Sequence, residues 1–177
     1  AGTGVTGLIR GTKAGDGPTV LLRADMDALP ILEENQVEYV SRNPGVMHAC
    51  GHDAHTAMLL GTTRLLLDRR NEFAGTVKVL FQPAEELPPG GAKPMIDEGV
   101  LEDPKVDAAF GIHIDQHSAV GKINVRSGPA MAAADRFVIT VNGKGGHGAS
   151  PEETIDPIVI GAQIISALQT LVSRTIR

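Results

Sequence analysis

The alternation of short apolar runs with helical patterns limits this chain to an α/β fold. Runs at residues 19–24, 76–81 and 106–114 predict buried strands, because they are continuous, short and bounded by turn-forming residues. Residues 54–70 and 92–99 have the pattern of helices between them. Strands that alternate with helices predict a layered α/β domain with a largely parallel sheet.

The pattern changes beyond these elements. Residues 135–142 alternate like a half-exposed strand, and residues 155–177 predict an amphipathic helix. We therefore expect a domain boundary within residues 126–134. The sequence opens inside a strand-like pattern at residues 5–10 and closes inside a helix without a stop signal, so we expect a piece of a longer protein.

Composition narrows the function classes. The 177 residues are 42% hydrophobic, which suffices for one domain or two small ones. The net charge is -5, basic residues are scattered, and aromatic residues are scarce, so nucleic-acid binding is not expected. No apolar run approaches the roughly 18 residues of a membrane span. A single cysteine fits a reducing cytoplasm, where we expect the protein to be located.

Residues 48–55, His-Ala-Cys-Gly-His-Asp-Ala-His, are the densest group of metal-binding side chains. They include the only cysteine, Cys50, and three of the six histidines. A thiol and imidazoles at this density indicate a transition-metal site. A lone cysteine is more often a small buried apolar residue, but other acidic and imidazole clusters fall in the predicted loops.

Three further polar clusters follow predicted strands: Asp25 with Asp27, Glu85 with Glu86, and His113. Each has an ordinary structural interpretation, as a turn cap, a solvated face or a core histidine. In open α/β sheets, however, ligand sites gather outside the carboxyl ends of the strands. Together with the segment at residues 48–55, these clusters predict a site for one or two divalent cations.

The paired glutamates have a specific chemical use. One carboxylate can bind a metal while its neighbour takes a proton from the metal-bound water. Pro83 before the pair and residues 88–91 after it indicate a rigid loop rather than a helix face. His147 lies in another loop, at residues 143–151, which lacks the pattern of a phosphate-binding loop and could equally be a glycine-rich hairpin.

Five motifs in order resemble the amidohydrolase branch of the aminoacylase/carboxypeptidase metallopeptidases, which includes hippurate hydrolases, auxin-conjugate hydrolases and N-acetyl-diaminopimelate deacetylases. They lie at residues 23–30, 48–55, 81–86, 111–114 and 145–151, the last followed by Asp-Pro-Ile at 156–158. The resemblance implies a three-layer α/β catalytic domain with a largely parallel, mixed sheet at residues 1–125. It assigns residues 126–177 to the start of an α+β ferredoxin-like lid and dimerisation domain.

The same resemblance implies roles for individual residues. It implies two divalent metal ions per subunit (zinc, manganese, cobalt or nickel), with four matching ligands: Cys50, His52, Glu86 and His113. Glu85 matches the general base. Asp25 falls where related branches of the family place a metal-binding histidine, and Asp27 falls where they place an aspartate that orients it. In this branch the resemblance implies that both aspartates steer the ligands. His147 matches a lid histidine that hydrogen-bonds the oxyanion in the active site of the other subunit.

The implied reaction is hydrolysis of N-acyl or N-aroyl amino acids to a carboxylate and a free amino acid, by a homodimer. An aminopeptidase or dipeptidase on the same scaffold, and a metal-binding or dimerisation module without activity, are alternatives. Two departures from the family pattern bear on this. Glu152 stands where many relatives have histidine, and the family's last metal-binding histidine falls beyond residue 177, so this stretch alone should bind metal poorly.

Overall fold

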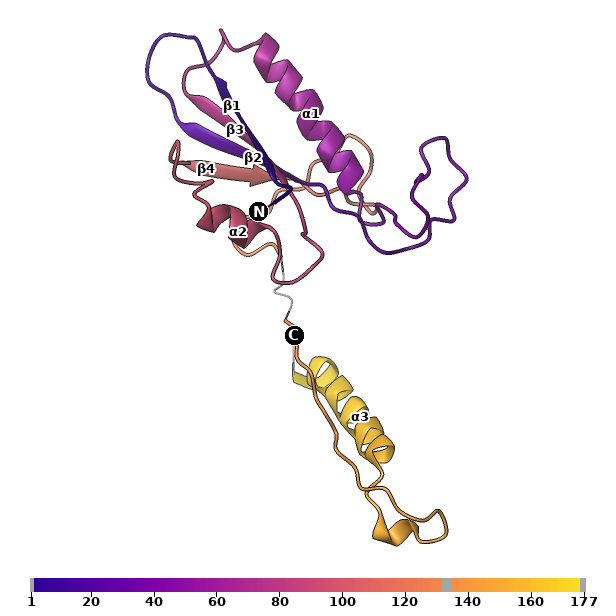
Figure 1. The fold of residues 1–177 in the computed structure, drawn as a ribbon. Coiled ribbons are helices and arrows are strands. Elements are labelled where there is room, and N and C mark those ends of the chain that lie inside the picture. The colour runs from indigo at the N-terminus through magenta and orange to yellow at the C-terminus, as the bar shows by residue number, and fades with distance from the viewer. Residues whose placement is uncertain (1, 132–134, 176–177) are drawn as a thin grey trace. The chain divides into compact units, whose positions relative to one another are not determined.

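The computed structural model describes residues 2–131 and 135–175 and forms two compact units, Ala1–Ile123 and Asn124–Arg177 (Figure 1). Each unit is described by itself below. The expected division between residues 125 and 126 lies close to the boundary between the units. The assignment of the two units to a catalytic domain and a lid stays a prediction.

The first unit is built on a mixed sheet of four strands. They are β1 (Val5–Arg10), β2 (Thr19–Asp25), β3 (Thr76–Gln82) and β4 (Ala108–Gly111), in the spatial order β1-β3-β2-β4. β2 pairs in parallel with both β3 and β4, whereas β1 pairs antiparallel with β3. The predicted α/β class with a largely parallel, mixed sheet is confirmed.

Successive side chains of a strand point to opposite sides of the sheet, so both faces carry apolar side chains that need covering. Helix α1 (His52–Asp68) covers one face, and its cluster of buried residues is Ile9, Ala24, Leu59 and Val79. Helix α2 (Ala92–Asp97) covers the other face, where the buried residues are Leu21, Leu80 and Met95. Helix, sheet and helix form three layers. Both helices form where their patterns predicted them: α1 begins and ends two residues earlier than expected, and α2 ends two residues earlier.

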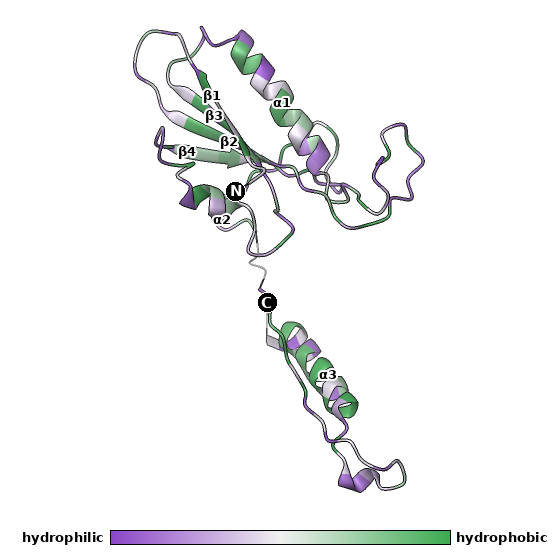
Figure 2. Ribbon diagram, viewed as in Figure 1, coloured by the Kyte–Doolittle hydropathy of each residue, from purple (hydrophilic) through white to green (hydrophobic). Residues whose placement is uncertain are grey.

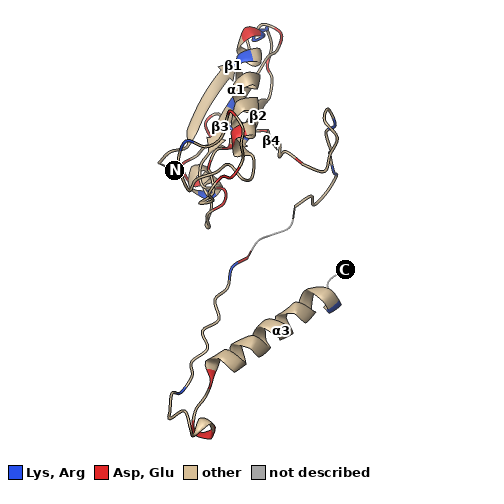
Figure 3. Cartoon of the chain, turned by 90° about the vertical axis from the view of Figure 1, so that its right-hand side faces the viewer, with Lys and Arg blue, Asp and Glu red and all other residues tan. Residues whose placement is uncertain are grey.

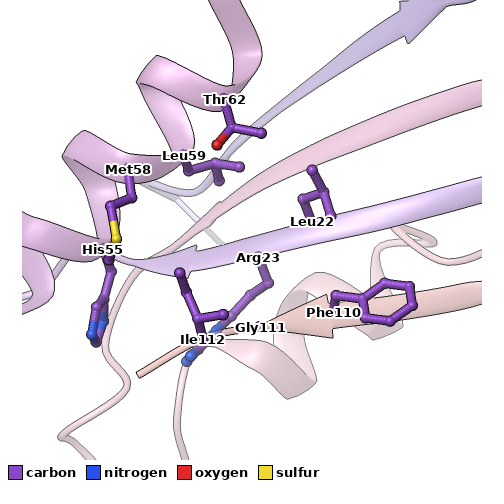
Figure 4. A pocket seen from close by; sticks show the side chains of 9 residues that line it. All are labelled: Leu22, Arg23, His55, Met58, Leu59, Thr62, Phe110, Gly111 and Ile112. Atoms are coloured by element: carbon purple, nitrogen blue, oxygen red, sulfur yellow. The ribbon is translucent and has the colours of Figure 1, made fainter. Parts of the chain in front are cut away.

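The expectation of a buried strand over residues 106–114 is wrong in two respects. Only Ala108–Gly111 forms a strand, and all four of its residues are exposed. β4 lies at the edge of the sheet and pairs only with β2, so no described element covers its outer side. Its side chains border an open pocket between β2 and α1, in which Phe110 remains 60% exposed (Figure 4).

The second unit differs more from expectation. The predicted strand at residues 135–142 does not form, because a strand needs a hydrogen-bonding partner and none of the described residues pairs with this segment. A short 3-10 turn, Pro151–Glu153, precedes helix α3 (Pro157–Thr175). The helix was expected over residues 155–177, of which 176 and 177 lie outside the described residues.

Helix α3 corrects one expectation about apolar segments. Its 19 residues have a mean hydropathy of 1.3 over an 18-residue window, so the helix is long and apolar enough to cross a membrane by length and composition alone. Figure 2 shows the apolar residues along it, and Figure 3 shows that charge is confined to its ends. Polar residues, among them Gln163 and Gln169, interrupt the apolar pattern.

Candidate metal centre

The candidate site lies at the carboxyl edge of the three parallel strands. Asp25 is the last residue of β2, the two glutamates follow β3, and His113 follows β4. Helix α1 begins at this edge with His52. The chain thereby brings donor atoms within 4.8 Å of one another in three overlapping groups that could hold a metal, all of which share His52. The groups are Cys50, His52 and His113; His52, Glu85 and Glu86; and Asp25, His52 and His55.

His52 is buried in an orientation that suits a metal ligand. Its side chain is 1% exposed, and its Nδ1 lies 3.0 Å from the backbone carbonyl oxygen of Asp27. A carbonyl oxygen only accepts, so Nδ1 carries the proton and Nε2 presents a lone pair. Nε2 is 3.8 Å from Oε1 of Glu86 and has no hydrogen-bond partner among the described residues. A buried nitrogen without a partner is costly unless something binds it.

His113 repeats the same arrangement from another element. Its Nδ1 lies 2.7 Å from the backbone oxygen of Ile114, which leaves Nε2 facing Sγ of Cys50 at 3.4 Å. Metal-binding histidines are commonly held in this way, with the second ring nitrogen bound to a carbonyl. Two imidazole nitrogens and one thiol sulfur therefore point toward a shared region, in which His113 Nε2 and Cys50 Sγ are hydrogen-bonded to each other.

The charge of the site favours a cation. Burial raises the pKa of the Cys50 thiol, and so do a hydrogen bond to Glu86 and the negative charges of Glu86, Glu85 and Asp25. The thiol therefore keeps its proton more strongly than an ordinary cysteine. A divalent cation would reverse this effect, because it would stabilise the thiolate and offset the surrounding carboxylates.

Asp27 organises the loops around the centre. Its Oδ2 accepts a hydrogen bond from the backbone N–H of Glu86 at 3.0 Å, and its backbone oxygen holds His52. Burial acts to raise the pKa of Asp27, but hydrogen bonds from the backbone of Glu86 and Glu85 outweigh it and lower the pKa. Ala84, before the glutamates, has a positive φ of 52°, an uncommon conformation for a residue other than glycine.

Asp25 is fully engaged by neighbours within the protein. It is 1% exposed, with Oδ1 2.6 Å from Nδ1 of His55 and Oδ2 2.7 Å from Nη1 of Arg23. Burial acts to raise the pKa of Asp25, but the His55 hydrogen bond and the charge of Arg23 outweigh it, so the pKa is lowered. With both oxygens occupied, Asp25 is suited to steering neighbouring groups rather than to binding a metal.

Comparison with known families settles what kind of protein carries this arrangement. Residues 21–175, nearly the whole chain, match the peptidase family M20/M25/M40. The chain belongs to this family. The resemblance drawn from the five sequence motifs is confirmed.

Individual M20 relatives and neighbours are consistent with this assignment. The chain is 56% identical over 158 residues to an N-acyl-L-amino acid amidohydrolase of Geobacillus stearothermophilus, covering 89% of this chain and 42% of the relative. It is 53% identical over 175 residues to thermostable carboxypeptidase 2 of Saccharolobus solfataricus, covering 98% and 44%. A crystal structure of a dinuclear metal-binding M20 peptidase from Bacillus subtilis matches with a TM-score of 0.67 and 48% identity, over 72% of this chain and 34% of that one. The chain thus spans less than half the length of these M20 proteins.

Most of the residues predicted for the M20 site lie together. The structure brings together seven of them: Cys50, His52, Glu85, Glu86 and His113, with Asp25 and Asp27 behind them. The eighth, His147, belongs to the second unit, where it is exposed and its Nδ1 accepts a hydrogen bond from the N–H of Ala149 at 3.2 Å. The roles of all eight residues in this M20 chain stay predictions.

Sequence reasoning assigned no role to two side chains that the M20 site contains. His55 and Arg23 both bind Asp25. Spacing carried a signal for each. His55 follows His52 by three residues and so shares its face of a helix, and Arg23 precedes Asp25 by two residues and so shares its face of a strand.

Proposed function

We propose that this M20 protein is a metal-dependent amidohydrolase that cleaves the amide bond of N-acyl or N-aroyl amino acids. The observation that carries the proposal is the buried Nε2 of His52, which has no partner among the described residues and faces Glu86 within the donor cluster. The name of the N-acyl-L-amino acid amidohydrolase relative supports the substrate class.

The donor atoms fit transition-metal ions. We propose four ligands within this chain: Cys50, His52, Glu86 and His113. A mixed set of thiolate, imidazole and carboxylate suits zinc, manganese, cobalt or nickel. Two cations per subunit are proposed because the M20 neighbour from Bacillus subtilis is dinuclear. Bound cations would supply Lewis acidity, which eases the deprotonation of water and polarises the amide carbonyl.

Glu85 is the proposed general base. Its side chain is exposed next to Glu86, so its carboxylate can reach the open side of the centre. It takes a proton from the attacking water while the water oxygen bonds to the amide carbon. The carbon–nitrogen bond then breaks, and Glu85 gives the proton to the leaving nitrogen. The products are a carboxylate and a free amino acid.

His147 is proposed to stabilise the oxyanion in the active site of a partner subunit of a homodimer. Its Nδ1 accepts a hydrogen bond from Ala149, so the proton of the neutral ring lies on Nε2, which is free to donate. One such donor is worth about 3–4 kcal/mol in related chemistry. A cytoplasmic location is proposed with it, on the basis of the single cysteine.

Metal content and substrate choice test the proposal together. The full-length protein is incubated with zinc or manganese, desalted and analysed by plasma mass spectrometry, beside Cys50→Ala. It is then assayed on an N-acetylated amino acid and on a dipeptide with a free N-terminus. Bound metal that Cys50→Ala loses, with turnover of the acetylated substrate only, supports the proposal. Turnover of the free dipeptide only would favour an aminopeptidase or dipeptidase, and no bound metal would exclude a metallohydrolase.

A further inference from the structure

His55 is a buried histidine that the proposed mechanism does not use. It is 1% exposed, and both of its ring nitrogens are engaged. Nε2 accepts the backbone N–H of Ile114 at 2.9 Å, so Nε2 carries no proton. Nδ1 therefore carries the proton of the neutral ring and donates it to Asp25 at 2.6 Å. With no free lone pair, His55 is not available as a metal ligand, unlike His52.

The contact with Ile114 connects His55 to a proposed ligand. The N–H of Ile114 is held by His55, and its carbonyl oxygen accepts the proton of His113 Nδ1 at 2.7 Å. The N–H and the carbonyl group belong to the same residue, so a shift of the Ile114 backbone would also move the oxygen that holds the His113 ring. The opposite nitrogen of that ring lies 3.4 Å from Sγ of Cys50.

His55 is itself held at a fixed place. Asp25, which accepts its proton, also binds Arg23, and Nε of Arg23 donates to Oε1 of Gln82 at 2.9 Å. The resulting chain of hydrogen bonds runs from the end of β3 through β2 and α1 to the segment after β4. In Figure 4, His55 extends from α1 near Met58 toward the edge where Arg23 and the residues after β4 lie. Charge-assisted bonds in a buried setting are short and specific in direction.

We propose that His55 is a positioning residue, which fixes the backbone of Ile114 and thereby sets the placement of His113 opposite Cys50. This inference rests on the proposed metal centre. It gives His55 a role different from that of His52, the proposed ligand three residues before it.

Three substitutions separate this role from simple packing. In His55→Gln the amide oxygen can replace Nε2 and accept the Ile114 N–H. In His55→Asn the shorter side chain can keep the donor to Asp25 but does not reach Ile114, and His55→Ala removes both groups. The control is His117→Asn, which removes an exposed imidazole from the segment after β4, where Ile114 also lies.

Two measurements on the full-length protein read out the effect. Amide hydrogen exchange at Ile114 is followed by NMR in the metal-free protein, and cobalt uptake is followed through the thiolate-to-cobalt absorption of Cys50. Thermal unfolding verifies that each variant is folded. We expect wild type, His55→Gln and His117→Asn to keep Ile114 protected and to show the cobalt absorption. His55→Asn and His55→Ala should lose the protection and bind cobalt about 10- to 100-fold more weakly.

Folded His55→Asn and His55→Ala proteins with wild-type Ile114 protection and cobalt binding would overturn the inference. A folded His55→Gln protein that loses the Ile114 protection and binds cobalt weakly would overturn it as well. If wild type takes up no cobalt, the proposed function fails, and Ile114 exchange alone then decides whether His55 holds this backbone: unchanged protection in His55→Ala overturns the inference.

Discussion

The Asp27 carboxylate holds the backbone of Glu86, whose N–H donates to Oδ2 of Asp27 at 3.0 Å. The backbone oxygen of the same aspartate accepts the Nδ1 proton of His52 at 3.0 Å. One residue after β2 therefore fixes two proposed ligands, one after β3 and one at the start of α1. The loops that meet at the carboxyl edge of the sheet are tied to one another here.

Removing this carboxylate should weaken metal binding without abolishing it. Asp27→Ala keeps the backbone oxygen that orients His52 but releases Glu86, so zinc affinity measured by calorimetry should fall about 10- to 100-fold. Asp107→Ala is a matched control, because Asp107 also accepts a backbone N–H, that of Thr19 at 2.7 Å, away from the donor cluster. Equal affinities in the two variants would show that Asp27 does not position the ligands.

Substitution of the proposed base should separate chemistry from metal binding. In the full-length protein, Glu85→Gln should lower kcat by about 10²- to 10⁴-fold, because the amide has no basic oxygen to accept the proton. Metal content should stay at the wild-type level, since Glu86 rather than Glu85 is the proposed ligand. Glu153→Gln, an exposed carboxylate in the second unit, should change neither quantity. Wild-type kcat in Glu85→Gln would remove Glu85 as the base.

Zinc affinity should fall as the pH is lowered from about 9 to about 7. The pKa of the Cys50 thiol is raised above its ordinary value of 9.0, so the thiol is protonated across this range and zinc must displace the proton. One displaced proton makes the zinc affinity change about tenfold per pH unit. Calorimetry in buffers of different ionisation enthalpy measures the released proton. A zinc affinity independent of pH would contradict thiolate ligation by Cys50.

Acid should remove the stability that Asp25 contributes. Its pKa is lowered from the ordinary value of 3.8, so the folded state favours the charged form. The contribution is complete above about pH 3.8, and it is lost as the pH falls through the lower pKa of the folded state. Urea unfolding of the metal-free protein should show Asp25→Asn less stable than wild type at neutral pH. The two unfolding free energies should converge below pH 3.8, and a constant difference would refute this contribution.

Gly51 should tolerate a side chain less well than a glycine of similar φ in open space. It has a φ of 80° between Cys50 and His52, and a Cβ built on it would overlap the side chain of Ile114. Gly45→Ala is the matched control, because Gly45 has a φ of 78° but open space around it, so its cost should be only about 1–2 kcal/mol of backbone strain. Urea unfolding should show a larger loss for Gly51→Ala. Equal losses would show that Ile114 moves aside freely.

Local patterns were sufficient for much of the fold and of the site. Alternation and apolar runs predicted β1, β2, β3, α1 and α2, because these elements bury their side chains against one another. Parallel strands end at one edge of a sheet, so the clusters at Asp25, Glu85 and His113 could be expected to meet. These inferences depend on neighbours in sequence and on one general rule of topology.

Features that depend on distant partners were not predictable in this way. The exposure of β4 depends on what lies against it, and the segment at residues 135–142 needs a partner strand that a local pattern cannot supply. The role of His55 depends on contacts with Asp25, 30 residues away, and Ile114, 59 residues away. Composition and spacing identify a histidine near the site but do not tell which of its nitrogens is already engaged.

The open side of β4 also governs how these 177 residues behave in concentrated solution. Residues 108–111 have an outer edge that pairs with no strand among the described residues, beside the exposed ring of Phe110. An uncovered, apolar edge strand is a template onto which another chain can add a strand. We therefore expect some self-association through this edge when this stretch is produced by itself, and a charged residue at position 110 is a direct means of reducing it.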